Sequence, residues 1–193
     1  LWHTQQQQHD KDTTTTTNKA RIVALQADSL RLTKQDIVNV IHNVVRTNHN
    51  TNSHEDHPDE GTTVPHIRFF SIDGSHTEEA VMSDISLAHS CLSAGGILVL
   101  DDALNPDWPG VTSGLSRYLM KQEESVTTTD SSSSLLLYPF AFGYNKCFLS
   151  TGDPWNTRYR NALQPYERKQ STFWNCPVSI LPQGFIASHF GND

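Results

Sequence analysis

Three carboxylates and one histidine stand where two apolar segments of this sequence end. The run "ILVL" leads directly into Asp101 and Asp102, and the run "IRFFSI" leads into Asp73, with His76 three residues further on. Adjacent carboxylates repel each other and lose hydration when they are partly buried, so a favourable partner is expected near them. Carboxylates are ligands for divalent cations, and a histidine can take up a proton near neutral pH.

A strand, a helix and a second strand are expected to position these residues. Both apolar runs are typical of buried strands. Between them, apolar residues recur on one helical face, at Val81, Ile85, Ala88 and Leu92. Ser75 and Glu78 have the spacing of a capping box at the start of this helix. Gly95 and Gly96 are expected to end the helix and to turn the chain into the second strand.

Upstream of this unit, a strand at 22–25 is followed by Asp28 and Ser29 and then by an amphipathic helix with Thr33 as its N-cap. The apolar face of that helix consists of Ile37, Val40, Ile41, Val44 and Val45.

Downstream, a helix at about 111–121 precedes two strands, 135–142 and 146–150. Only Gly-Tyr-Asn joins these strands, so they must form an antiparallel hairpin. A further helix is expected to end at Pro165, and 173–182 is either another strand or irregular.

This alternation of strands and helices predicts an α/β fold. Near-continuous apolar strands indicate a mostly parallel sheet covered on both faces. The expected architecture is a Rossmann-like three-layer sandwich that a C-terminal antiparallel hairpin closes. Ligands bind beyond the carboxyl ends of such strands. The acidic residues at those ends are Asp28, Asp73, Asp101 and Asp102.

The length of 193 residues suits one domain. The predicted organisation is a disordered polar lead-in at 1–19 and an α/β domain at 20–193, with low-complexity insertions near 47–65 and 122–134. Three histidines of the first insertion stand among acidic residues, but their spacing matches no ordinary metal site. The first residues show neither the basic nor the apolar region of a signal peptide.

Composition argues against two classes of partner. The formal net charge of −7 is unfavourable for binding nucleic acid, whose phosphates need a basic surface. No run reaches the roughly 18 apolar residues of a membrane span. The three cysteines, Cys91, Cys147 and Cys176, are widely spaced, which indicates buried thiols in a reducing compartment and a cytoplasmic location.

The segment "FFSIDGSHTEEAVMSDISLAHSCLSAGGILVLDD" resembles the fourth to fifth strand region of class I S-adenosylmethionine-dependent methyltransferases. It is most similar to the metal-dependent O-methyltransferase branch, which has "IDG-x-H" and "DD" strand ends. The hairpin around "FGYNKCFLS" is similar to the antiparallel strands of that fold. The resemblance covers residues 20–150 and is most specific over 69–110.

The resemblance implies roles for single residues. Asp28, with Ser29 beside it, would bind the adenine of S-adenosylmethionine, and Asp73 would lie near the sulfonium and the substrate. The positions that match the family's divalent-cation ligands, with Mg²⁺ as the expected ion, are Asp73, Asp101 and Asp102. His76 matches a histidine that acts as general base in sugar-type members.

The function that the resemblance implies is methylation of a hydroxyl on a small molecule or sugar, with help from a divalent cation. The family's glycine-rich loop does not occur in this sequence, because no G-x-G-x-G is found. A catalytically incomplete binding or scaffold domain is therefore the alternative. A small-molecule substrate is the expected partner, and a homo-oligomer is left open.

Structural interpretations compete with these functional ones. The acidic pair could form a solvated turn, and His76 could cap the next helix or bond to a neighbouring carboxylate. Trp108 could wall a substrate pocket, although packing of its own loop is the preferred interpretation. Asn145 and Lys146 are expected to serve the hairpin turn.

Overall fold

The structure is a computed structural model that describes residues 27–49, 67–128 and 136–182. The chain divides into two units, Leu1–Thr63 and Val64–Asp193, each of which is described by itself. Several predicted segments lie outside the described residues: the lead-in at 1–19, the strand at 22–25, and the 50–65 and 129–134 parts of the two insertions. None of the described helices is long and apolar enough to cross a lipid bilayer.

The first unit contains a short 3-10 turn, η1 (Ser29–Arg31), and helix α1 (Lys34–His49). Thr33 caps α1, as predicted, through a reciprocal pair of hydrogen bonds with Asp36. The Asp36 amide donates to Thr33 Oγ1 at 3.3 Å, and the Thr33 amide donates to Asp36 Oδ2 at 2.8 Å. This capping box satisfies amides that the first helical turn leaves unpaired.

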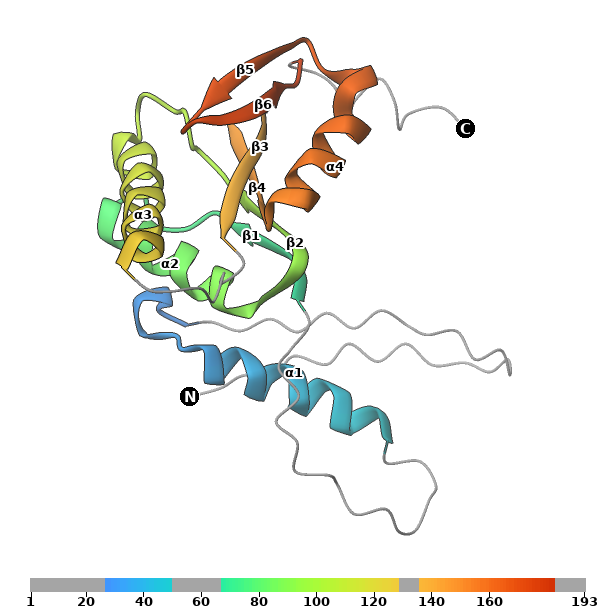
Figure 1. The fold of residues 1–193 in the computed structure, drawn as a ribbon. Coiled ribbons are helices and arrows are strands. Elements are labelled where there is room, and N and C mark those ends of the chain that lie inside the picture. The colour runs from blue at the N-terminus through green and yellow to red at the C-terminus, as the bar shows by residue number, and fades with distance from the viewer. Residues whose placement is uncertain (1–26, 50–66, 129–135, 183–193) are drawn as a thin grey trace. The chain divides into compact units, whose positions relative to one another are not determined.

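The second unit is built on one six-stranded sheet with the order β1-β2-β4-β3-β6-β5 (Figure 1). The strands are β1 (Ile67–Ile72), β2 (Leu92–Leu100), β3 (Leu137–Gly143), β4 (Lys146–Thr151), β5 (Lys169–Phe173) and β6 (Cys176–Ile180). The pairs β1–β2 and β3–β6 are parallel, and the other pairs are antiparallel. The predicted Rossmann-like α/β class and the β3–β4 hairpin are confirmed. The segment 173–182, left open by the sequence, supplies β6.

Helices lie on both faces of this sheet. They are α2 (Glu78–Cys91), α3 (Pro109–Thr128) and α4 (Asp153–Leu163), which continues into the 3-10 turn η2 (Gln164–Tyr166). Helices α2 and α3 pack together on one face, and α4 packs against β3 and β4 on the other (Figure 1).

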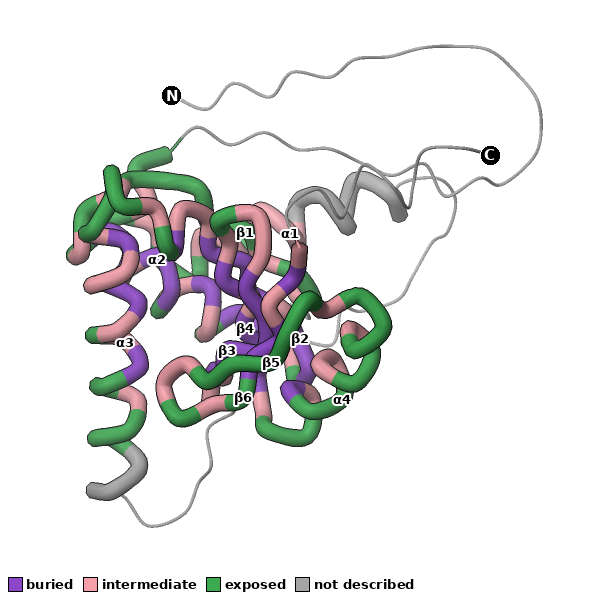
Figure 2. The backbone as a smooth tube through the Cα atoms, turned by 90° about the horizontal axis from the view of Figure 1, so that it is seen from above, coloured by how far each residue is buried: buried purple, intermediate pink, exposed green. Residues whose placement is uncertain are grey.

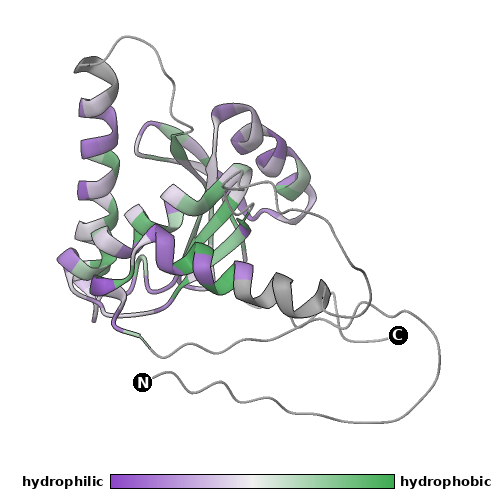
Figure 3. Ribbon diagram, turned by 90° about the horizontal axis from the view of Figure 1, so that it is seen from below, coloured by the Kyte–Doolittle hydropathy of each residue, from purple (hydrophilic) through white to green (hydrophobic). Residues whose placement is uncertain are grey.

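The core of the second unit lies between the sheet and helices α2 and α3. Buried residues follow the central strands and the inner sides of these two helices (Figure 2), and apolar residues gather there as well (Figure 3). The predicted helical faces supply Val81, Ile85, Ala88, Val111, Leu115 and Leu119, all buried. Each large apolar side chain buried in this way contributes about 1.5–3 kcal/mol to folding. All three cysteines are free.

Three sequence-based boundaries were wrong. Helix α2 is capped by Thr77, whose hydroxyl accepts a hydrogen bond from the Ala80 amide at 3.4 Å, and not by Ser75. Helix α3 continues to Thr128, into the predicted second insertion. Helix α2 ends at Cys91 and β2 begins at once, so the predicted glycine turn lies inside a strand.

Gly95 and Gly96 lie within β2, where its register with β1 is irregular between the pairs Ile67–Leu92 and Phe69–Ile97. Gly95 has a φ of +72°, in the left-handed region that favours glycine. A Cβ atom there would lie 2.5 Å from the indole of Trp155 on α4. Gly95 therefore lets the chain bulge while the indole packs directly on the strand.

Replacement of Gly95 by alanine is expected to lower the free energy of unfolding by about 2–5 kcal/mol. The left-handed backbone costs about 1–2 kcal/mol for a residue with a Cβ, and the clash with Trp155 adds about 1–3 kcal/mol. Urea denaturation measures the change. The exposed neighbour Ala94, changed to serine, is the control and should stay within about 0.5 kcal/mol of wild type. A fully stable Gly95→Ala protein would contradict this packing.

Candidate functional site

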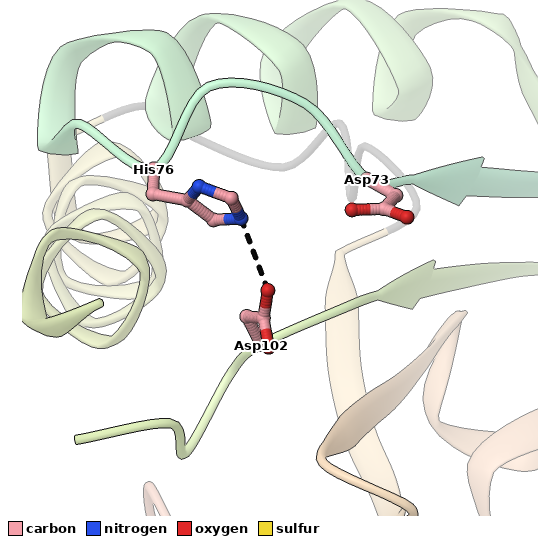
Figure 4. A group of neighbouring side chains, drawn as sticks. All are labelled: Asp73, His76 and Asp102. Atoms are coloured by element: carbon pink, nitrogen blue, oxygen red, sulfur yellow. Dashed lines mark ion pairs between the residues drawn. The ribbon is translucent and has the colours of Figure 1, made fainter. Parts of the chain in front are cut away.

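Asp73, His76 and Asp102 come together at the carboxyl edge of β1 and β2. Asp73 follows the end of β1, His76 lies in the loop before α2, and Asp102 follows the end of β2. One ligand atom from each of them lies within 4.8 Å of the other two. Figure 4 shows the imidazole and both carboxylates facing one shared gap. As predicted, side chains that follow the ends of β1 and β2 therefore come together, and the three that do so are Asp73, His76 and Asp102.

The closest contact in this group joins His76 to Asp102. The distance from His76 Nε2 to Asp102 Oδ2 is 3.0 Å (Figure 4), and the side chains are 28% and 20% exposed. Partial burial reduces the screening of this pair by water. His76 thus bonds to a neighbouring carboxylate, as one of the structural interpretations proposed, but it does so with the nitrogen that faces the gap.

Backbone and side-chain contacts fix the Asp102 carboxylate. Its backbone φ of 54° is left-handed, in the turn that directly follows β2. Asp102 Oδ1 accepts hydrogen bonds from the side-chain amide of Asn105, at 2.9 Å, and from the side-chain amide of Asn145. The hydrogen bond from Asn105 holds the pKa of Asp102 below its ordinary value. Burial opposes this effect, and the weaker influences of His76 and Lys146 lower the pKa further.

Asp101 has a different partner, because it ion-pairs with Lys146. Leu100 at the end of β2 lies opposite Cys147 of β4, so the next residue, Asp101, lies level with Lys146 across the antiparallel pair. Within the described residues the grouped side chains are Asp73, His76 and Asp102. The predicted cation-binding set of Asp73, Asp101 and Asp102 stays a prediction.

The loop after β2 also covers His76. The Trp108 indole stacks on the imidazole, with 4.3 Å between ring centroids and 17° between the ring planes. Gly110, at the start of α3, has no space for a Cβ because the His76 carbonyl oxygen occupies it. Sequence analysis preferred loop packing for Trp108; the structure places it against a predicted site residue.

Asp28 and Ser29 belong to the first unit. Asp28 caps η1 by accepting from the Leu30 amide at 3.1 Å, and it pairs with Arg31 at 3.3 Å. These contacts are local, and the carboxylate is more than half exposed. The predicted adenine-binding role of Asp28 and Ser29 stays a prediction.

Sequence reasoning missed the groups that hold the acidic residues in place. Asn145 and Lys146 were assigned to the hairpin turn and Asn105 was not singled out, yet each bonds to Asp101 or Asp102. The sequence places Asn145 in the tight turn of a predicted hairpin, but only the pairing of β2 with β4 brings that turn to the end of β2.

The grouped residues fit a divalent cation. Ligands at about 2.1 Å from an octahedral ion lie roughly 3 Å apart when adjacent and roughly 4.2 Å apart when opposite. The 3.0 Å between His76 Nε2 and Asp102 Oδ2 matches the separation of adjacent ligands, and all three ligand atoms lie within 4.8 Å of one another. Carboxylate oxygens suit Mg²⁺ and Mn²⁺, and the imidazole nitrogen suits Zn²⁺ or Fe²⁺, so the mixed set does not select Mg²⁺ alone.

Replacement of Asp102 by asparagine is expected to remove an acid-sensitive part of the stability. Because the folded pKa of Asp102 is lowered, its contribution is present above the ordinary value of 3.8 and is lost as the pH falls through the folded value. The difference in unfolding free energy between wild type and Asp102→Asn should therefore shrink below about pH 4. Urea denaturation at several pH values measures it, with the exposed Asp107→Asn as control. A difference that does not change with pH would be the contrary result.

Comparison with family models gives a match over residues 3–103 to the family described as Methyltransferase domain. The matched region is just over half of the chain, and it includes Asp73, His76 and Asp102 together with both strands that carry them. A comparison with curated proteins finds no match. With this match and the observed α/β fold, the chain belongs to the Methyltransferase domain family of class I S-adenosylmethionine-dependent methyltransferases.

Proposed function

We propose that this protein transfers the methyl group of S-adenosylmethionine to a hydroxyl of a small molecule or sugar, with help from a divalent cation. Membership of the family establishes methyl transfer from S-adenosylmethionine in general. The choice of a hydroxyl acceptor is carried by one observation: two carboxylates and an imidazole face the same gap at the carboxyl edge of the sheet. Ligands of open α/β sheets bind at this edge.

An alcohol needs a group that removes its proton before it can attack a methyl group. The acceptor oxygen forms a bond to the methyl carbon as the carbon–sulfur bond breaks, and S-adenosylhomocysteine leaves. Where no ion is bound, the hydroxyl proton passes to the His76–Asp102 pair, in which the carboxylate at 3.0 Å from Nε2 stabilises the imidazolium. Asp73, exposed on the other side of the gap, would add negative charge near the sulfonium of the bound cofactor.

Asp73 and Asp102 would hold the cation, and His76 is close enough to complete the set. When bound, the ion would make a coordinated hydroxyl more acidic and fix its position. Asn105 and Asn145 occupy Asp102 Oδ1, so Oδ2 is the oxygen presented to the gap. Asp101 is engaged by Lys146 and lies outside this set.

A metal-free reaction is the second candidate, and the direct His76–Asp102 contact favours it. The 3.0 Å pair is formed by protein groups alone. In this case His76 acts as general base while Asp73 and Asp102 orient the acceptor and stabilise charge. The two candidates share the acceptor but differ in their need for the ion and in the role of His76, which is a ligand of the ion in the first and the general base in the second.

Chelation separates these candidates. With S-adenosylmethionine and a panel of vicinal diols and sugars, a chelator should abolish methyl transfer, and Mg²⁺ or Mn²⁺ should restore it. His76→Gln should lower kcat about 10²–10⁴-fold because a ligand of the ion or, in the metal-free reaction, the proton acceptor is lost. Release of S-adenosylhomocysteine measures both effects, with Asp107→Asn as the control.

Unchanged activity in chelator, together with a loss in His76→Gln, would identify the metal-free reaction. Full activity in both experiments would refute the site itself.

The adenine-binding role proposed for Asp28 has its own test. Asp28→Ala should weaken S-adenosylmethionine binding about 10-fold, the effect of losing one hydrogen bond to a charged group. Calorimetry measures the affinity, and Arg31→Ala removes the local partner as a control while keeping the carboxylate. A wild-type protein whose melting temperature does not respond to S-adenosylmethionine would favour the catalytically incomplete domain.

A further inference from the structure

His76 is restrained from two directions. Asp102 contacts the edge of the imidazole at Nε2, and Trp108 lies on its face. A single hydrogen bond to one ring nitrogen leaves the plane of the ring free to tilt about that bond. The indole, nearly parallel to the imidazole and in stacking distance, removes this freedom. The two contacts together define both the direction of Nε2 and the plane of the ring.

Trp108 is itself held in a defined position. Its amide donates to the Asn105 carbonyl at 3.1 Å, and its carbonyl accepts from the Val111 amide at 3.0 Å in the first turn of α3. The Asp107 amide donates to the Asn105 side chain at 3.0 Å. The Asn105 side chain also donates to Asp102. Asn105 therefore supports both residues that restrain His76, Asp102 at the edge of the ring and Trp108 on its face.

Packing of a core does not account for this stack. Trp108 is 44% exposed, among the more exposed large apolar side chains of the described residues, and the His76 side chain is also accessible at 28%. Burial of apolar area against the sheet would place the indole inward instead. Here a large aromatic residue stays at the surface while it contacts the side chain that faces the acidic gap.

We propose that Trp108 is a positioning residue that holds the His76 imidazole in the plane from which Nε2 reaches the gap. The stack itself stands on geometry, and its effect on turnover rests on the proposed role of His76. Loss of the indole would let the ring tilt away from Asp73 and Asp102. An aromatic replacement would keep the restraint, and an aliphatic one would not.

Three variants test this inference: Trp108→Phe keeps a stacking ring, Trp108→Leu keeps apolar volume only, and Leu104→Ala changes another exposed residue of the same loop. In NMR spectra the His76 ring protons, assigned with His76→Gln, should be shifted upfield by the indole. This shift should be smaller in Trp108→Phe and absent in Trp108→Leu. Modification of His76 by diethyl pyrocarbonate, followed by mass spectrometry, should be faster in Trp108→Leu only.

The functional readout uses Mn²⁺ affinity and steady-state kinetics. Trp108→Leu should weaken Mn²⁺ binding about 10-fold, as loss of an orienting contact to a ligand does. It should also lower kcat while the KM for S-adenosylmethionine is unchanged, and Trp108→Phe should restore both quantities towards wild type. Melting curves of all variants show whether they fold.

Wild-type chemical shifts and modification rates in a folded Trp108→Leu protein would overturn the inference, whatever the chemistry of the site. If Trp108→Leu does not fold, Trp108→Phe serves instead. His76 ring shifts that do not change when phenyl replaces indole would then overturn the inference. Loss of the ring-current shift without any change in kcat or Mn²⁺ affinity would reject the positioning role. An active His76→Gln enzyme would instead refute the proposed function and leave the stack intact.

Discussion

Asp102 is the residue through which the parts of the site are joined. Its Oδ2 faces His76, and its Oδ1 accepts from Asn105 in its own loop and from Asn145 at the tip of the β3–β4 hairpin. The backbone at Asp102 is left-handed, in the turn that directly follows β2.

The two adjacent acids are stabilised separately. Asp101 lies level with Lys146 across an antiparallel pair, and its charge is offset there. Asp102 is stabilised by the side-chain amides of Asn105 and Asn145 and by the imidazole of His76. Protein groups on both sides therefore offset the repulsion between Asp101 and Asp102, so that a cation would not be required to offset it.

The matched family region and the segments beyond it both contribute to the site. Asp73, His76 and Asp102 lie within the match, whereas Asn105, Trp108 and Asn145 follow it. The first group carries the groups that can exchange protons or bind cations. The second group fixes their orientation, through hydrogen bonds to Asp102 and a ring stacked on His76.

The sequence alone determined the α/β class, the β3–β4 hairpin, and the meeting of the ends of β1 and β2, because apolar periodicity and short links are local properties. It could not determine which acid faces the gap. Asp101 and Asp102 are chemically identical neighbours, and only the register of β2 against β4 and the left-handed turn at Asp102 distinguish them. The contacts of Trp108 with His76 and of Asn145 with Asp102 could not be predicted for a related reason: they form only when loops from separate strands are brought to one edge of the sheet.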